Sequence, residues 1–356
     1  MGNMSYSDNT VAADVVDILA ARLPPGWQAA VSARERGGGT TPPACVDMVL
    51  KIRGPGAPAG LVLVGAKTRL EPKDVDYLAV TLRPTPKQPV LVAAPFISTR
   101  TQERLEAQGF GYADLTGNVR LSLSQPGLFV ETTGASENPE PSLRDRKSLK
   151  GAKAGRLVRA LCDFRTPMGL REAAKRAGVD AGYASRVVGL LNREALITRS
   201  GRTPITSVDW QGLLRRWSQE YSPFRRGGAT MYLAPRGVPA VVDKLKSVRT
   251  RFAVTGSWVA AQVAPVAPPR LLLVYVDERA VVDKQLDLRP TDTGANVALL
   301  TPFDGVVYER ASKKNGIACT ALSQVVADLL TSPGRGPKEA EALMEWMRDN
   351  EGTWRV

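Results

Sequence analysis

In the first 135 positions, segments with the apolar spacing of helices alternate with short, continuous apolar runs. Apolar residues recur every three to four positions in residues 14–23, 72–82 and 98–109, which predicts three helices. In the last of these, Ser98 is placed to cap the start of the helix and Gly109 to end it. Short apolar runs bounded by Gly or Pro occupy residues 46–52, 60–66 and 89–97, a pattern that is typical of strands. Residues 112–123 and 128–133 are expected to add further strands. We therefore expect an α/β domain with a mixed sheet over residues 1–140.

The pattern changes between residues 141 and 210. Residues 154–164 have the spacing of an amphipathic helix, with Leu157, Leu161 and Phe164 on one face, and residues 170–177 have the spacing of a second helix. Gly178 supplies a tight turn, and Asp180 is placed to cap a third helix over residues 181–194. Residues 195–210 follow as two short strands joined by a turn that contains Gly and two Arg. This succession predicts a winged helix-turn-helix, with these core residues: Ala173, Val179, Val187, Leu190 and Leu191.

Two polar segments suggest where domains end. GASENPEPS at residues 134–142 has the Pro, Ser and Glu content of a linker, and YSPFRRGG at residues 221–228 marks a second change of composition. Apolar strands at residues 270–276 and 296–300 and a terminal helix from residue 337 onward follow the second segment. We expect three domains, at residues 1–140, 141–210 and 211–356, in a chain of the α/β multi-domain class.

Charge is concentrated in the central segment. The chain has a net charge of +13, and residues 143–226 contain 19 Lys and Arg against 7 Asp and Glu, so this segment holds an excess of 12 positive charges. The flanking regions are close to neutral. A local basic excess of this size favours a polyanionic partner, because it neutralises phosphates. Double-stranded DNA is the partner that we expect.

Composition also excludes several classes of protein. The chain has no His, so no Ser/His or Cys/His dyad can form, and no zinc site of the usual Cys/His type can be assembled. Cys45, Cys162 and Cys319 are far apart and fit buried apolar positions better than a disulfide framework. The sequence has no apolar run of membrane-spanning length, and its start lacks the features of a signal peptide. We expect a cytoplasmic protein without a membrane role.

The candidate DNA contacts lie in and around the third helix of the central segment. The N-terminal half of such a helix enters the major groove, where Arg pairs with guanine and Ser or Tyr contacts bases or phosphates. We assign base contact first to Arg186, then to Ser185 and Tyr183, and we place Arg199 and Arg202 of the wing at phosphates or the minor groove. An alternative is a three-helix structural or protein-docking module. Further basic candidates for DNA contact are Lys150, Lys153, Arg171 and Arg193.

The strand pattern of residues 1–140 resembles the restriction-endonuclease-like superfamily. The metal site of that superfamily uses an Asp at one strand and a Glu-x-Lys on the next, and the matching positions here are Asp47, Gly65 and Lys67. Because two carboxylates are needed to hold Mg²⁺ against a scissile phosphate, Gly65 removes a ligand. The resemblance therefore implies a degenerate domain that does not cleave DNA. Asp114 and Asn118, with Gly117 between them, are expected to form a structured turn.

Residues 252–278 look like a nucleotidyltransferase core. Gly256 and Ser257 open a helix, as in the Gly-Ser turn that contacts nucleotide phosphates, and a strand ends in Asp277. Acidic residues must alternate to project from one face of a strand, but Glu278 follows Asp277 directly and Arg279 occupies the third position. We expect no catalytic residue, metal or cofactor in this domain.

Residues 149–356 together resemble the AbiE-type antitoxins of type IV toxin-antitoxin systems and related actinobacterial winged-helix regulators. The resemblance rests on the winged helix-turn-helix, on GANVALLTPFDGVVYER, on the Ser323–Gln324 pair before VVADLLTSPGRGPKEAEAL and on a terminal Trp-containing helix. It implies a DNA-binding repressor of its own operon. The chain could also bind inverted repeats as a homo-oligomer, and a cognate toxin could be a further partner. Two alternatives also remain: a metal-dependent DNA nuclease targeted by the winged helix, and an antitoxin that acts by binding a protein.

Overall fold

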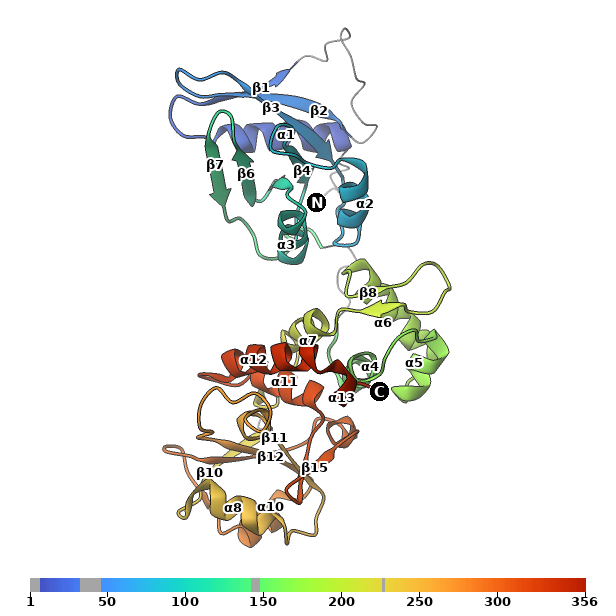
Figure 1. Cartoon of the computed structure of the whole chain (residues 1–356), viewed down its shortest axis with the longest axis vertical. Coiled ribbons are helices and arrows are strands. Elements are labelled where there is room, and N and C mark those ends of the chain that lie inside the picture. Colours follow the sequence, from blue (N-terminus) through green and yellow to red (C-terminus); the bar gives the residue numbers. More distant parts are fainter. Residues whose placement is uncertain (1–6, 33–45, 142–147, 226–227) are drawn as a thin grey trace. The chain divides into compact units, whose positions relative to one another are not determined.

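The computed structural model describes residues 7–32, 46–141, 148–225 and 228–356 (Figure 1). The chain divides into two compact units, one of Met1–Arg146 with Arg193–Ala195 and one of Lys147–Asn192 with Leu196–Val356. Each unit contains a sheet and several helices, which confirms the mixed α/β class. None of the helices in the described ranges is both long and apolar enough to cross a bilayer. Cys162 and Cys319 are buried, as expected, and Cys45 lies outside the described residues.

The first unit is built on a seven-stranded mixed sheet, counted over its described residues, with the strands in sequence order from β1 to β7. Strands β1, β2 and β3 are antiparallel, β3, β4 and β5 are parallel, and β5, β6 and β7 are again antiparallel. The strands are β1 (Gln28–Ser32), β2 (Met48–Arg53), β3 (Gly60–Ala66), β4 (Val90–Ala94), β5 (Gly111–Asp114), β6 (Val119–Leu123) and β7 (Leu128–Thr132).

Helices cover both faces of this sheet. Because successive strand residues point to opposite faces, Leu91 and Ala93 of β4 pack with α1 (Asp8–Ala20), while Val92 packs with α2 (Asp74–Thr81) and α3 (Thr99–Ala107). The continuous apolar run of β4 in the sequence reflects this burial on two sides. The Ser98 hydroxyl accepts the Thr101 N–H at 3.3 Å and caps α3 as predicted.

Strand β1 was not predicted from the sequence. It forms one edge of the sheet in the described structure, where it pairs with β2, and all five of its residues are exposed or half-buried. An edge strand that faces solvent does not need a run of apolar residues, so the hydrophobic pattern contains no signal for it.

The second unit contains another sheet, seven-stranded in its described residues, in the order β13-β10-β14-β12-β11-β16-β15. In Figure 1, α11 and α12 lie on one side of this sheet, and α8 and α10 lie on the other. Its strands are β10 (Ala229–Leu233), β11 (Phe252–Thr255), β12 (Leu272–Val276), β13 (Arg289–Pro290), β14 (Val297–Leu300), β15 (Ser312–Lys314) and β16 (Ile317–Cys319), and β8 (Ile197–Thr198) and β9 (Ser207–Val208) form a separate pair. Its helices are α4 (Ala152–Asp163), α5 (Leu170–Arg176), α6 (Ala181–Arg193), α7 (Trp210–Ser218), α8 (Gly237–Leu245), α9 (Ser257–Ala260), α10 (Arg279–Gln285), η2 (Gly305–Tyr308, 3₁₀), α11 (Leu322–Leu330), α12 (Gly336–Asp349) and α13 (Glu351–Trp354).

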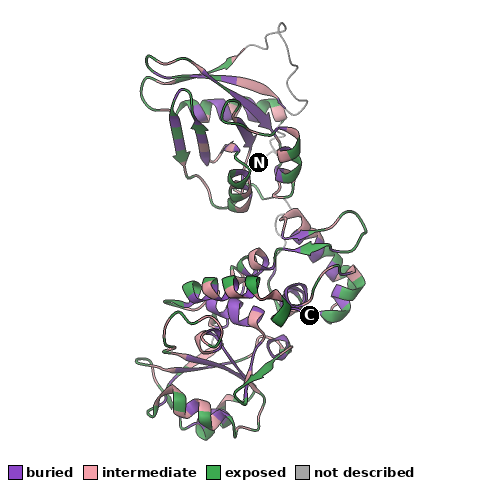
Figure 2. Ribbon diagram, in the orientation of Figure 1, coloured by how far each residue is buried: buried purple, intermediate pink, exposed green. Residues whose placement is uncertain are grey.

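The larger of two hydrophobic cores in the described part of the second unit connects its helices to its large sheet. It joins buried residues of α4, α5 and α6 to buried residues of the large sheet and of α11 and α12 (Figure 2). Trp217 of α7 stacks on Tyr221 with ring centroids 4.4 Å apart, and Phe303 packs edge-on against Tyr221. We expected separate domains for residues 141–210 and 211–356. However, Trp210 packs edge-on against Trp354 across that boundary, with ring centroids 5.0 Å apart, and residues 147–192 and 196–356 form one compact unit.

A buried polar network fixes α4 in this core. The Arg159 guanidinium is 1% exposed, donates to the Asp163 carboxylate at 2.9 Å and donates to the side-chain oxygen of Gln324 at 2.9 Å. Gln324 in turn donates to the buried carboxylate of Asp328 at 2.8 Å, which also accepts the hydroxyl of Tyr221 at 2.7 Å. A buried charge is tolerated only when it is paired and hydrogen-bonded, so this network ties α4 and α11 to one arrangement.

Candidate nucleic-acid interface

A tight turn joins α5 to α6. Gly178 has a positive φ of 59°, a conformation that favours glycine, and the Val179 N–H donates to the Ala174 carbonyl at 3.0 Å. The Asp180 carboxylate then accepts the Tyr183 N–H at 2.6 Å, which satisfies a free N–H in the first turn of α6. This hydrogen bond is the main reason that the pKa of Asp180 is lowered. The turn and the cap were both predicted from the sequence.

Helix α6 has a buried face and an exposed face. Ser185 and Arg186 are exposed, and Tyr183 is half-buried and packs against the core. Of the predicted core positions, Ala173, Val187, Leu190 and Leu191 are buried, and Val179 is half-buried against the same core. The exposed residues in the N-terminal half of α6 are therefore Ala181, Gly182, Ser185 and Arg186, of which Ser185 and Arg186 have polar side chains.

Basic side chains gather around Tyr183 at the start of α6. The Arg186 guanidinium carbon lies 5.9 Å from the centre of the Tyr183 ring, and the Lys153 ammonium of α4 lies 6.0 Å from it. Lys153 is also 3.7 Å from the carboxylate of Asp180. Burial raises the pKa of Tyr183, so the ring is neutral near pH 7. The structure thus brings together Lys153, Tyr183 and Arg186, three of the predicted contacts.

The hairpin after α6 is a short sheet with an exposed loop. Strands β8 and β9 are antiparallel, and Met168 and Ile205 add a further bridge with N–O distances of 2.9 and 3.0 Å. Arg202 is exposed in the loop, next to Gly201. The Arg199 backbone N–H donates to the side chain of Asn192 at 3.1 Å, and the Arg199 side chain donates to the Thr203 carbonyl at 2.7 Å. Arg199 is therefore held against the loop, whereas Arg202 projects from an exposed position.

The other predicted contacts are spread over the helical segment. Lys150 is exposed just before α4, Arg171 is exposed in the first turn of α5, and Arg193 is half-buried at the last position of α6. In the described part of the chain, none of these three cations has a ring contact with Tyr183. The Asn192 contact and the Met168–Ile205 bridge were missed, because the sequence gives no direct signal for a single polar contact between distant positions.

The nuclease-like positions of the first unit meet at β2 and β3. The Asp47 N–H donates to the Val64 carbonyl at 2.9 Å, and its carboxylate accepts the Ala66 N–H at 2.7 Å. Asp47 therefore lies opposite Gly65, the residue at the Glu position of the motif. Lys67, which directly follows β3, is half-buried. Among the described residues, no group of three Asp, Glu or Cys side chains is placed to hold a metal ion.

The turn at residues 114–118 has a structural role in the first unit. The buried carboxylate of Asp114 accepts five hydrogen bonds, from the N–H groups of Ile97, Thr116 and Asn118 and from the side chains of Thr116 and Asn118. The Asn118 side chain also accepts the Gly134 N–H at 2.8 Å. These bonds satisfy the carboxylate internally, which accounts for the predicted structured turn.

The nucleotidyltransferase-like positions of the second unit contact neighbouring side chains. The Ser257 hydroxyl at the start of α9 donates to the carboxylate of Glu339, and the Asp277 carboxylate accepts the Tyr308 hydroxyl at 2.8 Å. Glu278 is exposed directly beside Asp277, and Arg279 donates to the Thr230 hydroxyl. The Ser257 hydroxyl therefore serves the packing of α9 against α12.

No protein-family model matches the chain, and comparisons with curated proteins and with solved structures find no significant match.

Proposed function

We propose that this chain is a sequence-specific double-stranded DNA-binding protein, in which α4, α5, α6 and the β8–β9 hairpin act as a winged helix-turn-helix. The observation that carries the proposal is the N-terminal half of α6, where Ser185 and Arg186 are exposed and the Arg186 and Lys153 cations lie 5.9 and 6.0 Å from the centre of the Tyr183 ring. This group lies in the segment that holds an excess of 12 positive charges.

The geometry of α6 suits the major groove. The groove admits an α-helix, and the first turns of the inserted helix contact base edges. Arg186 is the residue whose planar guanidinium can donate two parallel hydrogen bonds to guanine. Tyr183 supports it from the same turn, since its ring lies within 6 Å of the Arg186 guanidinium carbon. We assign specificity to Arg186, with Ser185 as a second contact.

The remaining basic residues are assigned to phosphates. Lys153, Arg171 and Arg202 are exposed on α4, on α5 and in the hairpin loop, and Lys150 is exposed before α4. Contacts to phosphates set register and affinity without reading sequence. Arg199 and Arg193 belong to this class with smaller contributions, because they are only partly exposed.

We further propose a regulatory role, as a transcriptional repressor or antitoxin-like regulator. This proposal rests on the resemblance of residues 149–356 to AbiE-type antitoxins, and it leaves room for binding as a homo-oligomer on inverted repeats or to a toxin. A protein-docking role in place of DNA binding is the competing interpretation. It predicts no saturable complex with any duplex.

For the first unit, we propose a degenerate nuclease-like domain without hydrolytic activity. The support is that Asp47 lies opposite Gly65 and uses its carboxylate to accept the Ala66 N–H. Incubation of supercoiled and linear duplex DNA with the chain and Mg²⁺ or Mn²⁺ should leave the DNA intact. Metal-dependent nicking that disappears in Lys67→Ala would show that the nuclease hypothesis is right.

Selection of bound duplexes from a random pool tests the main proposal. We expect enrichment of a short motif, and at physiological salt we expect the enriched duplex to bind at least about 1,000-fold more tightly than a scrambled duplex of the same length. A pool that shows no enriched motif, or equal affinity for both duplexes, would contradict sequence-specific binding.

A further inference from the structure

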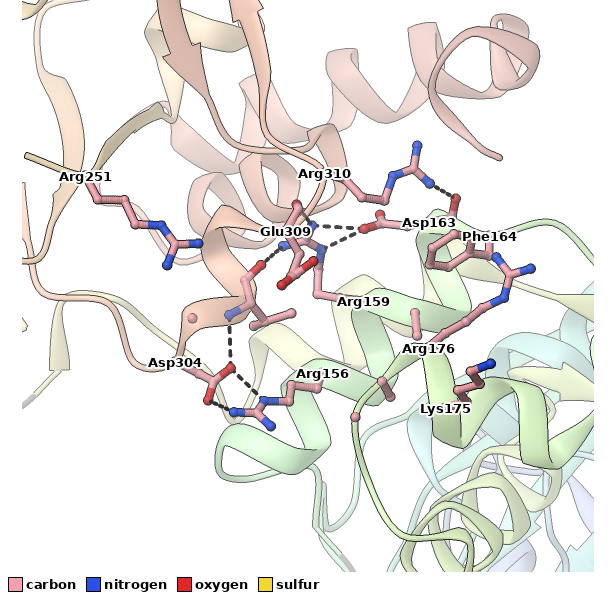
Figure 3. Close-up of a pocket in the computed structure, with 15 residues that line it drawn as sticks. Arg156, Arg159, Asp163, Phe164, Lys175, Arg176, Arg251, Asp304, Glu309 and Arg310 are labelled. Carbon is pink, nitrogen blue, oxygen red and sulfur yellow. Dashed lines mark hydrogen bonds and ion pairs between the residues drawn. The ribbon is translucent and has the colours of Figure 1, made fainter. Parts of the chain in front are cut away.

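The second unit contains a pocket beside the turn between α5 and α6. Its volume is about 400 Å³, which lies in the range of small-molecule sites. Figure 3 shows side chains from α4, from the end of α5 and from residues 304–310 around it, with Arg251 across from them. These residues are far apart in the sequence, so the pocket is a product of the fold.

The pocket lining is basic. Six Lys and Arg side chains and three Asp and Glu side chains line the pocket. Two of the three carboxylates already serve a lining arginine, because Asp163 pairs with Arg159 at 2.9 Å and Asp304 pairs with Arg156 at 2.7 Å. Glu309 is the remaining carboxylate. The lining contains four further cations: Lys175, Arg176, Arg251 and Arg310.

Two of these cations are held in place without a carboxylate contact in the described structure. Arg310 donates to the backbone carbonyls of Asp163 at 2.6 Å and Trp354 at 2.9 Å, and Arg251 lies 4.1 Å from the centre of the Tyr308 ring. Carbonyls and aromatic rings orient a guanidinium but leave its charge available to an anion. Lys175, which also lines the pocket, is exposed.

The aromatic ring of Phe164 also orients cationic side chains of the pocket. The guanidinium carbons of Arg176 and Arg310 lie 4.0 and 5.1 Å from the centre of its ring. Arg176 also pairs with Glu172 on α5 at 2.6 Å, outside the lining of the pocket. Side chains that are ordered before a ligand arrives lose less conformational entropy on binding, so the arrangement favours a bound anion.

We infer that this pocket binds a soluble small molecule that carries phosphate groups. Three cationic groups, Lys175, Arg251 and Arg310, exceed the single carboxylate of Glu309, which matches a ligand with at least two negative charges. Guanidinium groups fit phosphate oxygens through parallel hydrogen bonds. The size of the pocket suits a compact molecule such as pyrophosphate or a nucleotide. This inference does not depend on the proposed DNA binding.

Calorimetric titration of the full chain tests the inference. The probes are inorganic phosphate, pyrophosphate and ATP, with citrate as a carboxylate of similar charge. We expect saturable binding of at least one phosphorylated probe with a stoichiometry of one, and weaker binding of citrate. No saturable binding by any phosphorylated probe, or citrate binding at equal or higher affinity, would overturn the inference.

Matched variants locate the site. Arg251→Gln and Lys175→Gln should each weaken binding of the phosphorylated probe by about tenfold, the effect of one lost charged hydrogen bond. Arg249→Gln and Lys338→Gln remove one exposed positive charge outside the pocket lining and should change the affinity by less than about twofold, as expected for screened surface charges. All four side chains belong to exposed residues, and equal thermal unfolding would show that the fold is kept. Equal losses of probe affinity in both pairs of variants would show that the probe does not bind in this pocket.

Competition with a random-sequence duplex shows whether the pocket binds a small molecule or a DNA phosphate. We expect the probe to stay bound in the presence of the duplex, and Arg251→Gln to keep its duplex affinity. Displacement of the probe by the duplex, together with an equal loss of duplex affinity in Arg251→Gln, would assign the pocket to DNA phosphates and overturn the inference.

Discussion

The side-chain oxygen of Asn192, in the last turn of α6, accepts the backbone N–H of Arg199 at 3.1 Å, and this bond links the helix to the start of the hairpin loop. Asn192 is half-buried, and Arg199 directly follows strand β8. The bond therefore sets where the hairpin leaves the helix, so the proposed wing and the proposed recognition helix are positioned together.

Loss of this bond should cost stability. Asn192→Ala removes the acceptor and leaves the Arg199 N–H without it, so we expect the free energy of unfolding to fall by about 1 kcal/mol, the usual net value of one hydrogen bond. Denaturant unfolding measures the change. Ser185→Ala, an exposed change on the same helix, is the control and should have an effect below about 0.5 kcal/mol. An unchanged free energy in Asn192→Ala would show that the contact does not support the hairpin.

Arg202 tests the proposed phosphate contact of the loop. Arg202→Ala should weaken binding to all duplexes alike and should reduce the slope of log affinity against log salt by about 0.9, the value for one phosphate neutralised. Fluorescence anisotropy at several salt concentrations measures both quantities. Lys338→Ala removes an exposed charge from α12 and should leave the slope unchanged. A loss confined to the selected duplex would instead make Arg202 a base contact.

Asp328 gives the second unit a pH-dependent stability. Burial raises the pKa of this carboxyl group, although the hydroxyl of Thr255 and three other donors act in the opposite direction. The unfolded state has a pKa near about 3.9, so it ionises first as the pH rises and native stability falls between that value and the raised native pKa. The stabilising effect is complete below about pH 4 and is lost at higher pH.

The variant Asp328→Asn isolates this effect, because an amide does not titrate. We expect the stability of the native chain relative to the variant to fall between pH 4 and pH 7, by about 1.4 kcal/mol for each unit by which the native pKa is raised within that range. The hydrogen bond from Arg156 lowers the pKa of Asp304. Its pH-dependent effect on stability is the same in both proteins, so it cancels in the comparison. Denaturant unfolding at the two pH values measures the difference. A difference that stays constant, or that grows with pH, would contradict a raised native pKa.

Local patterns predicted much of the fold. The apolar runs of β3 and β4, the start of α3 at Ser98 and the start of α6 at Asp180 depend on neighbouring residues, and the sequence contains those neighbours. The exposed position of Arg186 follows from the same helical spacing that buries Val187 and Leu190. The core and the exposed face of the candidate interface were therefore predictable.

Features that join distant positions were not predictable. Arg159 and Asp163 are four residues apart on α4, a spacing that usually indicates a solvent-exposed ion pair. They are buried because Gln324 and the carbonyl of Val306 accept from Arg159, and these partners are about 150 residues or more away in the sequence. The basic pocket has the same origin, since Arg251 and Arg310 reach it from separate segments.

The most direct test of the account concerns Arg186 and compares two affinities of one variant. Arg186→Ala should weaken binding to the selected duplex by about 1 to 3 kcal/mol, should relax the preference at one base pair, and should change binding to scrambled DNA much less. Equal losses on the selected and the scrambled duplex would contradict sequence recognition by α6 through Arg186.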